Sequence, residues 1–257
     1  SIFLIFNLTF VNSAQAGPTN VTTASVGTGG NVGTEIKPQA IAFNGNGEKM
    51  FVLHNRTPNN NVSSSNFDRV EEYDLGTGFD ISASSISSIQ ATKIVKDQET
   101  APRGLAFNND GTKMFVVGDA GNDINEYTLT TGFDVSSASF VDGNGDGTGF
   151  SVNSQDTKPR GLAFNNDGTK MFVVGDDGND INEYTLTTGF DVSSASFVDG
   201  NGDGTGFSVT TQTPTPSGIA FNNDGTKMFV TDRGGADVHS YDLDAPFDIG
   251  FTDPILS

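Results

Sequence analysis

The residues of this sequence best suited to chemistry lie in an acidic, glycine-rich loop that occurs twice. The oxygen-bearing side chains alternate with glycine in both copies: Asp142, Asn144 and Asp146 in the first, and Asp199, Asn201 and Asp203 in the second. Oxygen ligands at alternate positions, followed by glycine, are typical of the first half of a calcium-binding loop, in which the chain wraps around the ion. The spacing therefore predicts a Ca²⁺ site in each copy.

A plain acidic hairpin is the alternative interpretation of the same loops. A complete EF-hand has a bidentate Glu at its twelfth position, where this chain has Asn153 and Thr210. An ion held here would need further oxygen atoms from backbone carbonyls, water or a neighbouring strand. A second acidic cluster, at residues 176–180 with a counterpart at 119–123, is expected to be a solvated hairpin.

Three further side chains are candidate binding residues. Arg103 and Arg160 each precede a Gly-Leu-Ala-Phe segment, and they could bind an anion together or form ordinary ion pairs with the many carboxylates. His54 opens a connection that is ten residues longer than its counterparts elsewhere in the chain. A single insertion on a repetitive scaffold, here residues 55–68, is a suitable place for binding specificity.

The sequence contains no recognisable catalytic set. It has two His and no Cys, and it shows neither a Ser/His/Asp order nor a phosphate-binding loop. The lack of Cys excludes disulfide bonds and thiolate chemistry. These features favour a non-catalytic protein over an enzyme.

An internal repeat must position all of these residues. Residues 102–152 and 159–209 are the same except for Ala120 and Asp177, and looser copies lie on both sides. The equivalent phenylalanines are 64, 57 and 57 residues apart, at Phe43, Phe107, Phe164 and Phe221. A repeat of this period indicates one supersecondary unit that is stacked on copies of itself.

Each repeat has the pattern of four short antiparallel strands. In the second copy they are expected at residues 104–107, 113–117, 124–129 and 139–141, separated by Asn-Asp-Gly and Thr-Gly-Phe-Asp turns. No segment has a sustained helical period. The pattern predicts an all-β, four-bladed β-propeller in which Phe and Val pack the blades together. The Phe of the repeated Phe-Asp pair is expected to be buried, and its Asp to cap a turn.

The two ends of the chain predict how the ring closes. Residues 20–25 resemble the start of a fourth strand, which the last repeat lacks. We therefore expect an N-terminal strand to complete the last blade and to remove an exposed edge. The expected propeller spans residues 17–257, with blades at about 38–100, 101–157, 158–214, and 215–257 together with 18–37.

The first sixteen residues resemble a secretory signal. Eight of the ten residues from 2 to 11 are apolar, and an Ala-Gln-Ala sequence follows at 14–16. This predicts a secreted, periplasmic or cell-surface protein. The alternative is that the apolar segment docks into a neighbouring molecule.

The net charge limits the classes of molecule that this protein can bind. The chain has 13 basic and 32 acidic residues, a net charge of −19. Nucleic acids and anionic membranes are excluded as partners because both need a positive surface. Ten apolar residues are also too few to span a bilayer.

The repeat resembles those of the NHL, YVTN and lactonase-like β-propeller superfamily. The resemblance rests on Gly-Leu-Ala-Phe-Asn-Asn-Asp-Gly-Thr-Lys-Met-Phe-Val-Val at 104–117, on Asn-Asp-Ile-Asn-Glu-Tyr at 122–127, and on Phe-Val-Thr-Asp at 229–232. It implies a propeller over residues 20–250. The superfamily includes binding platforms, surface-layer proteins and hydrolases, and its lactonase-like members hold a metal in the channel through Glu, Asn and Asp from several blades. No such set can be matched here.

The sequence thus predicts a secreted, non-catalytic propeller that serves as a binding or surface-interaction scaffold, for a protein or glycan surface, with Ca²⁺ in two loops. The alternatives are a metal-dependent, lactonase-like hydrolase and a subunit of an extracellular filament or layer.

Overall fold

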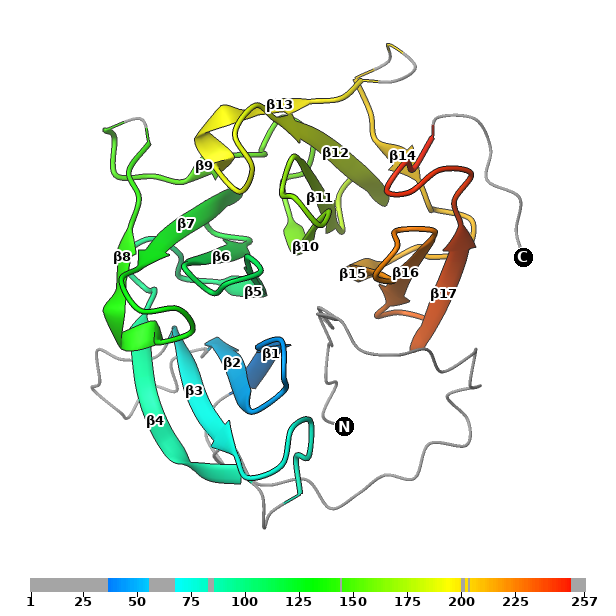
Figure 1. Cartoon of the computed structure of the whole chain (residues 1–257). Coiled ribbons are helices and arrows are strands. Elements are labelled where there is room, and N and C mark those ends of the chain that lie inside the picture. The colour runs from blue at the N-terminus through cyan, green and yellow to red at the C-terminus, as the bar shows by residue number, and fades with distance from the viewer. Residues whose placement is uncertain are drawn as a thin grey trace, which may run out of the picture.

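Four small antiparallel sheets arranged in a ring make up the fold (Figure 1). A computed structural model describes residues 37–55, 68–82, 86–143, 145–199, 202 and 204–250. The helices among these residues are two short 3-10 helices, η2 (Val135–Ser137) and η3 (Val192–Ser194). The all-β class and the four-bladed β-propeller expected from the repeat are confirmed.

Consecutive strands pair with one another within every blade. The strands of blade 1 are β1 (Lys37–Phe43), β2 (Lys49–Asn55), β3 (Arg69–Leu75) and β4 (Ile86–Ile94). Those of blade 2 are β5 (Pro102–Phe107), β6 (Lys113–Gly118), β7 (Asp123–Leu129), β8 (Ala138–Phe140) and β9 (Phe150–Ser151). Both β8 and β9 pair with β7, so two short pieces form the outer edge of that sheet.

Blade 3 repeats blade 2, and blade 4 has three described strands. The strands of blade 3 are β10 (Pro159–Phe164), β11 (Lys170–Gly175), β12 (Asp180–Leu186), β13 (Ala195–Phe197) and β14 (Phe207–Ser208). Those of blade 4 are β15 (Pro216–Phe221), β16 (Lys227–Asp232) and β17 (Asp237–Asp242). The N-terminal strand predicted to complete blade 4 and the apolar leader at 1–16 lie outside the described residues.

Phenylalanine pairs join blade 1 to blade 2, blade 2 to blade 3, and blade 3 to blade 4. Ring centroids are 4.5 Å apart for Phe51 and Phe107, and 4.6 Å apart both for Phe115 with Phe164 and for Phe172 with Phe221. In every pair the first ring comes from a second strand and the other from the innermost strand of the following blade. The expected packing through Phe is confirmed.

Small residues allow the innermost strands to approach closely around the axis. A Cβ atom at Gly104 would lie 2.7 Å from the carbonyl oxygen of Arg160, and one at Gly161 would lie 3.0 Å from the Cα of Gly218. The first distance is shorter than real Cβ contacts and the second is tighter than most of them, so a larger side chain would push neighbouring blades apart.

A glycine and a phenylalanine fit together in the turns of every repeat. In blade 2, Gly111 has φ +72° and Phe133 has φ +59°, and a Cβ on Gly111 would collide with the Phe133 ring. Asp134 accepts a hydrogen bond from the N–H of Ser136 at 3.0 Å, as expected of a turn cap. The expected burial of this ring holds for Phe247, whereas Phe133 and Phe190 are half-buried and Phe79 of blade 1 is 48% exposed.

Lysine and glutamate provide a polar link between blades. Lys113 Nζ donates to Glu126 at 2.6 Å and to the carbonyl oxygen of Phe190, in the next blade, at 2.7 Å. Glu126 in turn accepts the N–H of Val192 at 3.0 Å. Since the same arrangement links blade 1 to blade 2 through Glu72 and Val135, the ring is held by repeated contacts of two kinds, aromatic and charged.

Candidate functional site

A chain of ion pairs and one hydrogen bond to a neutral side chain connects polar residues on or next to the inner and second strands of all four blades. Arg103 on β5 donates to Gln39 on β1 at 3.1 Å and to Asp119 at 2.8 Å. Asp119 lies 3.7 Å from Arg160 on β10, which binds Asp176 at 2.6 Å. Asp176 also accepts a bond from Arg233 of blade 4 at 2.8 Å. We call these residues the axial network: Gln39, Arg103, Asp119, Arg160, Asp176 and Arg233.

The axial network brings together the two arginines that the sequence selected. The sequence left open whether these arginines bind an anion or form ordinary ion pairs. In the structure they form ion pairs, with Asp119 and Asp176 as the partners. Arg160 is 8% exposed, and its Nε has no hydrogen-bond partner among the described residues. Guanidinium groups shared between carboxylates of different blades fix the relative positions of those blades.

A second polar site lies on one sheet face of blade 1, around Glu71. His54 Nε2 is 2.9 Å from Glu71 Oε2, which also accepts the hydroxyl of Tyr73 at 2.6 Å. Arg69 Nε donates to Glu71 Oε1 at 2.7 Å. His54 is fully buried, and its Nδ1 has no partner among the described residues. The sequence selected His54 for its place beside the insertion, whereas the structure makes it part of a buried charged cluster.

Burial and contacts act in opposite directions on Glu71. Burial by itself would raise the pKa of this carboxyl group, but the contacts with His54, Tyr73 and Arg69 lower the pKa to about 2. Glu71 is therefore ionised at neutral pH, and the fold gains stability from that charge.

The same sheet face is polar in every blade. His54, Arg69, Glu71 and Tyr73 of blade 1 occupy the register positions held by other residues in the following blades. The equivalent sets are Gly118, Asp123, Asn125 and Tyr127 in blade 2, Gly175, Asp180, Asn182 and Tyr184 in blade 3, and Asp232, Asp237, His239 and Tyr241 in blade 4. We call this set the polar layer.

A residue from the preceding connection extends the polar layer in three blades. These residues are Glu99, Asp156 and Thr213, which are at most 1% exposed. Asp123 and Asp180 are also buried, so the expectation of solvated hairpins at 119–123 and 176–180 is wrong for those two residues. Each is the first residue of a third strand, and its side chain turns inward to accept the N–H of Gly149 or Gly206.

The acidic loops predicted to bind calcium are folded around their first aspartate. Asp142 accepts the N–H groups of Gly145 at 2.6 Å, Asp146 at 3.1 Å and Gly147 at 2.9 Å. Asp199 makes equivalent bonds to Gly202 and Gly204. Asn144, Asn201 and Asp203 lie outside the described residues, as do residues 56–67 of the insertion.

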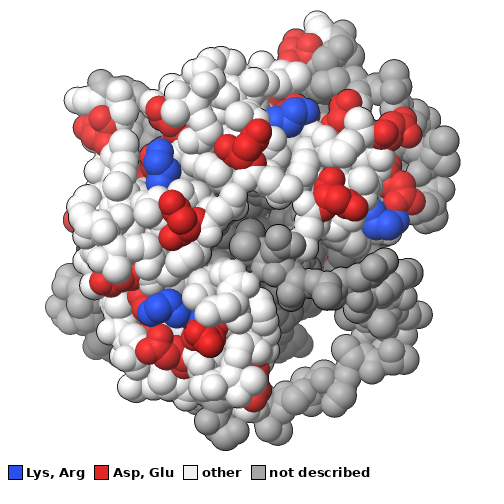
Figure 2. Space-filling model, in the orientation of Figure 1, with Lys and Arg blue, Asp and Glu red and all other residues white. Residues whose placement is uncertain are grey.

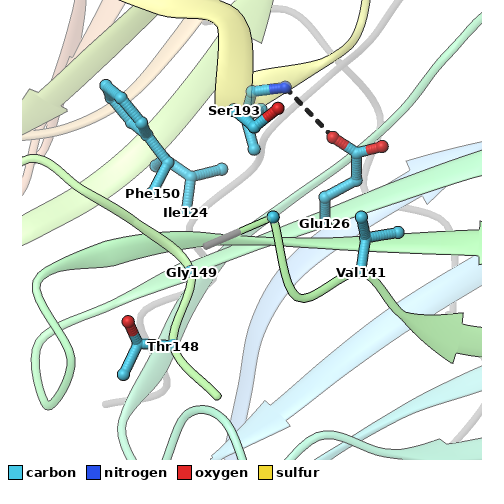
Figure 3. Close-up of a pocket in the computed structure, with 9 residues that line it drawn as sticks. Ile124, Glu126, Val141, Thr148, Gly149, Phe150 and Ser193 are labelled. Carbon is cyan, nitrogen blue, oxygen red and sulfur yellow. Dashed lines mark hydrogen bonds between the residues drawn. The ribbon is translucent and has the colours of Figure 1, made fainter. Parts of the chain in front are cut away.

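A small hollow lies under the first acidic loop (Figure 3). It is lined by blade 2 residues including Val141, Thr148 and Phe150, and by Ser193 of blade 3. It has room for little more than one water molecule. The hollow is thus a feature of the blade junction rather than a substrate pocket.

No cluster of three or more His, Asp or Glu suited to a metal ion occurs in the described part of the chain. Among the same residues, no helix has the length and hydropathy needed to cross a membrane. On the face seen in Figure 2, acidic side chains outnumber basic ones, and the basic ones lie beside acidic neighbours.

Sequence reasoning missed Glu71, Glu99 and Asp156. A usable signal was present, because Gln-Glu-Thr at 98–100 and Gln-Asp-Thr at 155–157 precede innermost strands at equivalent positions. An acidic residue that recurs immediately before a buried strand indicates a role at the blade junction.

Solved structures with the same fold are β-propeller proteins. A putative 6-phosphogluconolactonase from Bacteroides fragilis matches with a TM-score of 0.52 and 13% identity, over 89% of this chain and 57% of that one. A chain of the nidogen/laminin complex matches with a TM-score of 0.51 and 12% identity, over 84% of this chain and 63% of that one. This chain therefore spans less than two thirds of either protein. No family model and no curated protein matches the sequence.

Proposed function

We propose that the protein is a secreted, periplasmic or cell-surface propeller, similar to the NHL and YVTN types, that binds a protein or glycan surface and catalyses no reaction. The observation that carries this proposal is the exposed apolar surface of blade 1. Three of the four large apolar side chains that stand exposed in the described part of the chain belong to this blade: Phe79, Ile81 and Ile89.

Blade 1 differs from its neighbours most at its outer strand. Its β4 has nine residues, whereas β8 and β13 have three. By register, Ile89 opposite Tyr73 replaces Phe140 opposite Tyr127, where the two rings pack edge to face at 5.7 Å. Ile89 is 48% exposed. Apolar side chains gathered on one blade of an otherwise acidic protein are suited to contact with a partner.

Calcium in the two acidic loops is part of the proposal. Asp142, Asn144 and Asp146 would hold one ion, and Asp199, Asn201 and Asp203 the other. The spacing of the oxygen-bearing residues supports this assignment, although both oxygens of Asp142 also accept backbone N–H groups of the loop. Bound Ca²⁺ would supply positive charge and rigidity rather than chemistry.

A lactonase-like hydrolase is the competing function, because one protein of similar fold is described as a lactonase. Against it, the charged side chains at the ends of the inner strands are engaged in the axial network. An extracellular filament or layer remains a third hypothesis, and it depends on residues 2–11, which lie outside the described part.

Binding can be tested by surface plasmon resonance against immobilised polysaccharides and extracellular proteins in millimolar Ca²⁺. We expect at least one of them to retain the protein and the Ile89→Lys variant to lose that binding. Ser139→Lys, on the exposed outer strand of blade 2, should bind as the wild type does. Equal binding by wild type and Ile89→Lys, or hydrolysis of gluconolactone that a chelator abolishes, would contradict the proposal.

The calcium sites can be tested separately by titration calorimetry of chelated protein. The double variant Asp142→Asn/Asp199→Asn should bind two fewer Ca²⁺ ions than the wild type. An unchanged stoichiometry would show that these loops are plain hairpins.

A further inference from the structure

A buried carboxylate oxygen at the junction of blades 2 and 3 has no hydrogen-bond partner of normal geometry among the described residues. Asp156 lies in the connection between β9 and β10 and is 1% exposed. Its Oδ1 accepts the N–H of Lys158 at 2.6 Å, whereas its Oδ2 has no hydrogen bond from any described residue. A buried carboxylate oxygen with neither a hydrogen-bond donor nor a cation beside it raises the free energy of the folded state. We therefore expect a ligand at this site.

The carboxylate of Asp156 occupies the space that a side chain on Gly175 would fill. A Cβ atom added to Gly175 would collide with Asp156 Oδ2. Val174 pairs with Ile181, so the next position of the register places Gly175 beside Asp180. Side chains alternate between the two faces of a strand. Asp156 therefore reaches the sheet face on which Asp180 and Asn182 lie.

Asn182 contributes a second oxygen without a partner. It is 1% exposed, and its Oδ1 has no hydrogen bond within the described residues. Its Nδ2 donates to Asp180 Oδ1 at 3.0 Å, which holds the amide group beside that carboxylate. The face thus presents two carboxylates and one amide oxygen in an interior position.

Blade 2 offers an internal comparison at the carboxylate of the connection, whereas its amide oxygen, Asn125 Oδ1, also lacks a partner among the described residues. Glu99 stands in place of Asp156, and its extra methylene lets both of its oxygens reach backbone donors. These donors are the N–H groups of Ala101 at 2.6 Å, Ala120 at 3.2 Å and Gly121 at 3.1 Å. The shorter Asp156 accepts one such bond, from Lys158, and the backbone of Asp177 interacts with its carboxylate without a hydrogen bond of normal geometry to Oδ2.

The one difference between the two long repeats lies beside this site. Ala120 of blade 2 corresponds to Asp177 of blade 3, and Asp177 accepts the hydroxyl of Thr157, the neighbour of Asp156, at 2.6 Å. The change from Ala120 to Asp177 adds a negative charge to blade 3. The change from Glu99 to Asp156 shortens the side chain, so that one of its oxygen atoms lacks a hydrogen bond of normal geometry. Burial, together with Asp180 and Asp177, raises the pKa of Asp156 to about 6.

We propose that the junction of blades 2 and 3 binds one hard divalent cation, with Asp156 Oδ2, Asp180 and Asn182 Oδ1 as ligands. Two carboxylates balance the charge of such an ion, and all three groups are oxygen donors of the kind that Ca²⁺ prefers. The site is distinct from the two acidic loops, and it ties the connection leaving blade 2 to the sheet of blade 3.

The experiment measures Ca²⁺ binding by calorimetry in the Asp142→Asn/Asp199→Asn background, so that the loops do not contribute. We expect one ion per chain and a melting temperature about 5–10 °C higher at Ca²⁺ one hundredfold above the dissociation constant. Adding Asp156→Glu should abolish both effects. This variant should fold, because blade 2 already carries Glu at the equivalent position.

A gain of binding provides the matched control. Converting blade 2 to the blade 3 sequence with Glu99→Asp/Ala120→Asp should add a second ion in the same background. The proposal is overturned if the background variant binds no Ca²⁺, which would mean that water or a proton satisfies Asp156. It is also overturned if Asp156→Glu leaves the stoichiometry unchanged.

Discussion

Two buried carboxyl groups, Glu71 and Asp156, account for much of the pH dependence expected of the folding stability. Ionisation of the first stabilises the fold, and ionisation of the second destabilises it. Glu71 is held in its ionised form by His54, Arg69 and Tyr73. Asp156 lies among other carboxylates and has a raised pKa. Whether the pKa of each group is raised or lowered depends on whether positively charged side chains contact it, and not on burial alone.

Replacing Asp156 by Asn should stabilise the protein at neutral pH in the presence of a chelator. The folded-state pKa of about 6 is above the ordinary value of 3.8, so ionisation above pH 6 opposes folding. The variant should gain about 1–2 kcal/mol at pH 7, and this gain should disappear as the pH falls to about 3, where the wild-type group is mostly protonated in both states. Urea unfolding between about pH 3 and pH 7 measures the difference. A variant less stable than the wild type at pH 7 would contradict it.

Replacing Glu71 by Gln should have the opposite effect. Its folded-state pKa of about 2 is below the ordinary value of 4.5, so its contribution is complete above pH 4.5 and is lost as the pH falls toward 2. We expect a loss of about 2–4 kcal/mol at pH 7, because His54 and Arg69 lose their buried partner. Glu48→Gln, at an exposed position, is the control. Acid unfolding curves of the two variants should differ, and identical curves would refute the assignment.

At the scale of elements, the repeat makes the packing of one blade against the next predictable. Phe190 packs against Phe164 at 5.3 Å and Phe115 at 6.4 Å, whereas its counterpart Phe79 has one ring contact, with Phe43 at 5.4 Å. The two residues share a positive φ and the turn glycine below the ring. They differ in that Phe190 also contacts Phe115 of the preceding blade.

Phe190→Ala should therefore cost about 2–4 kcal/mol of unfolding free energy, and Phe79→Ala less than about 1 kcal/mol. Because backbone strain is the same at both sites, the difference between the variants reports on packing between blades. Chemical denaturation measures both values. Equal losses would mean that Phe190 contributes only within its own turn.

The blade architecture was predictable from the sequence, but the polar layer was not. Turn residues, strand periods and the Phe pairs follow from local patterns that recur four times. By contrast, Asp156 and Gly175 are nineteen positions apart, and only the pairing of β11 with β12 brings Asp180 to the same face. Arg103 and Arg160 could be selected as candidates, yet their partners Asp119 and Asp176 depend on how adjacent blades meet.

At the scale of the whole molecule, near-identical blades form a scaffold on which small changes create individual sites. One residue distinguishes the long repeats, and it lies next to Asp156. In blade 1 the polar layer contains the ion pair of His54 and Glu71, and the side chain of Ile89 is exposed. We infer that the functional sites of this molecule lie at positions where one blade differs in sequence from the others.

The most direct test of this account is an anomalous difference map from crystals of the full chain grown in Ca²⁺ and soaked with Tb³⁺. We predict a peak beside Asp156, Asp180 and Asn182, with none at the equivalent position beside Glu99 and Asp123. A peak in the axial channel, held by side chains from three or more blades, would instead indicate a catalytic metal centre and contradict the account.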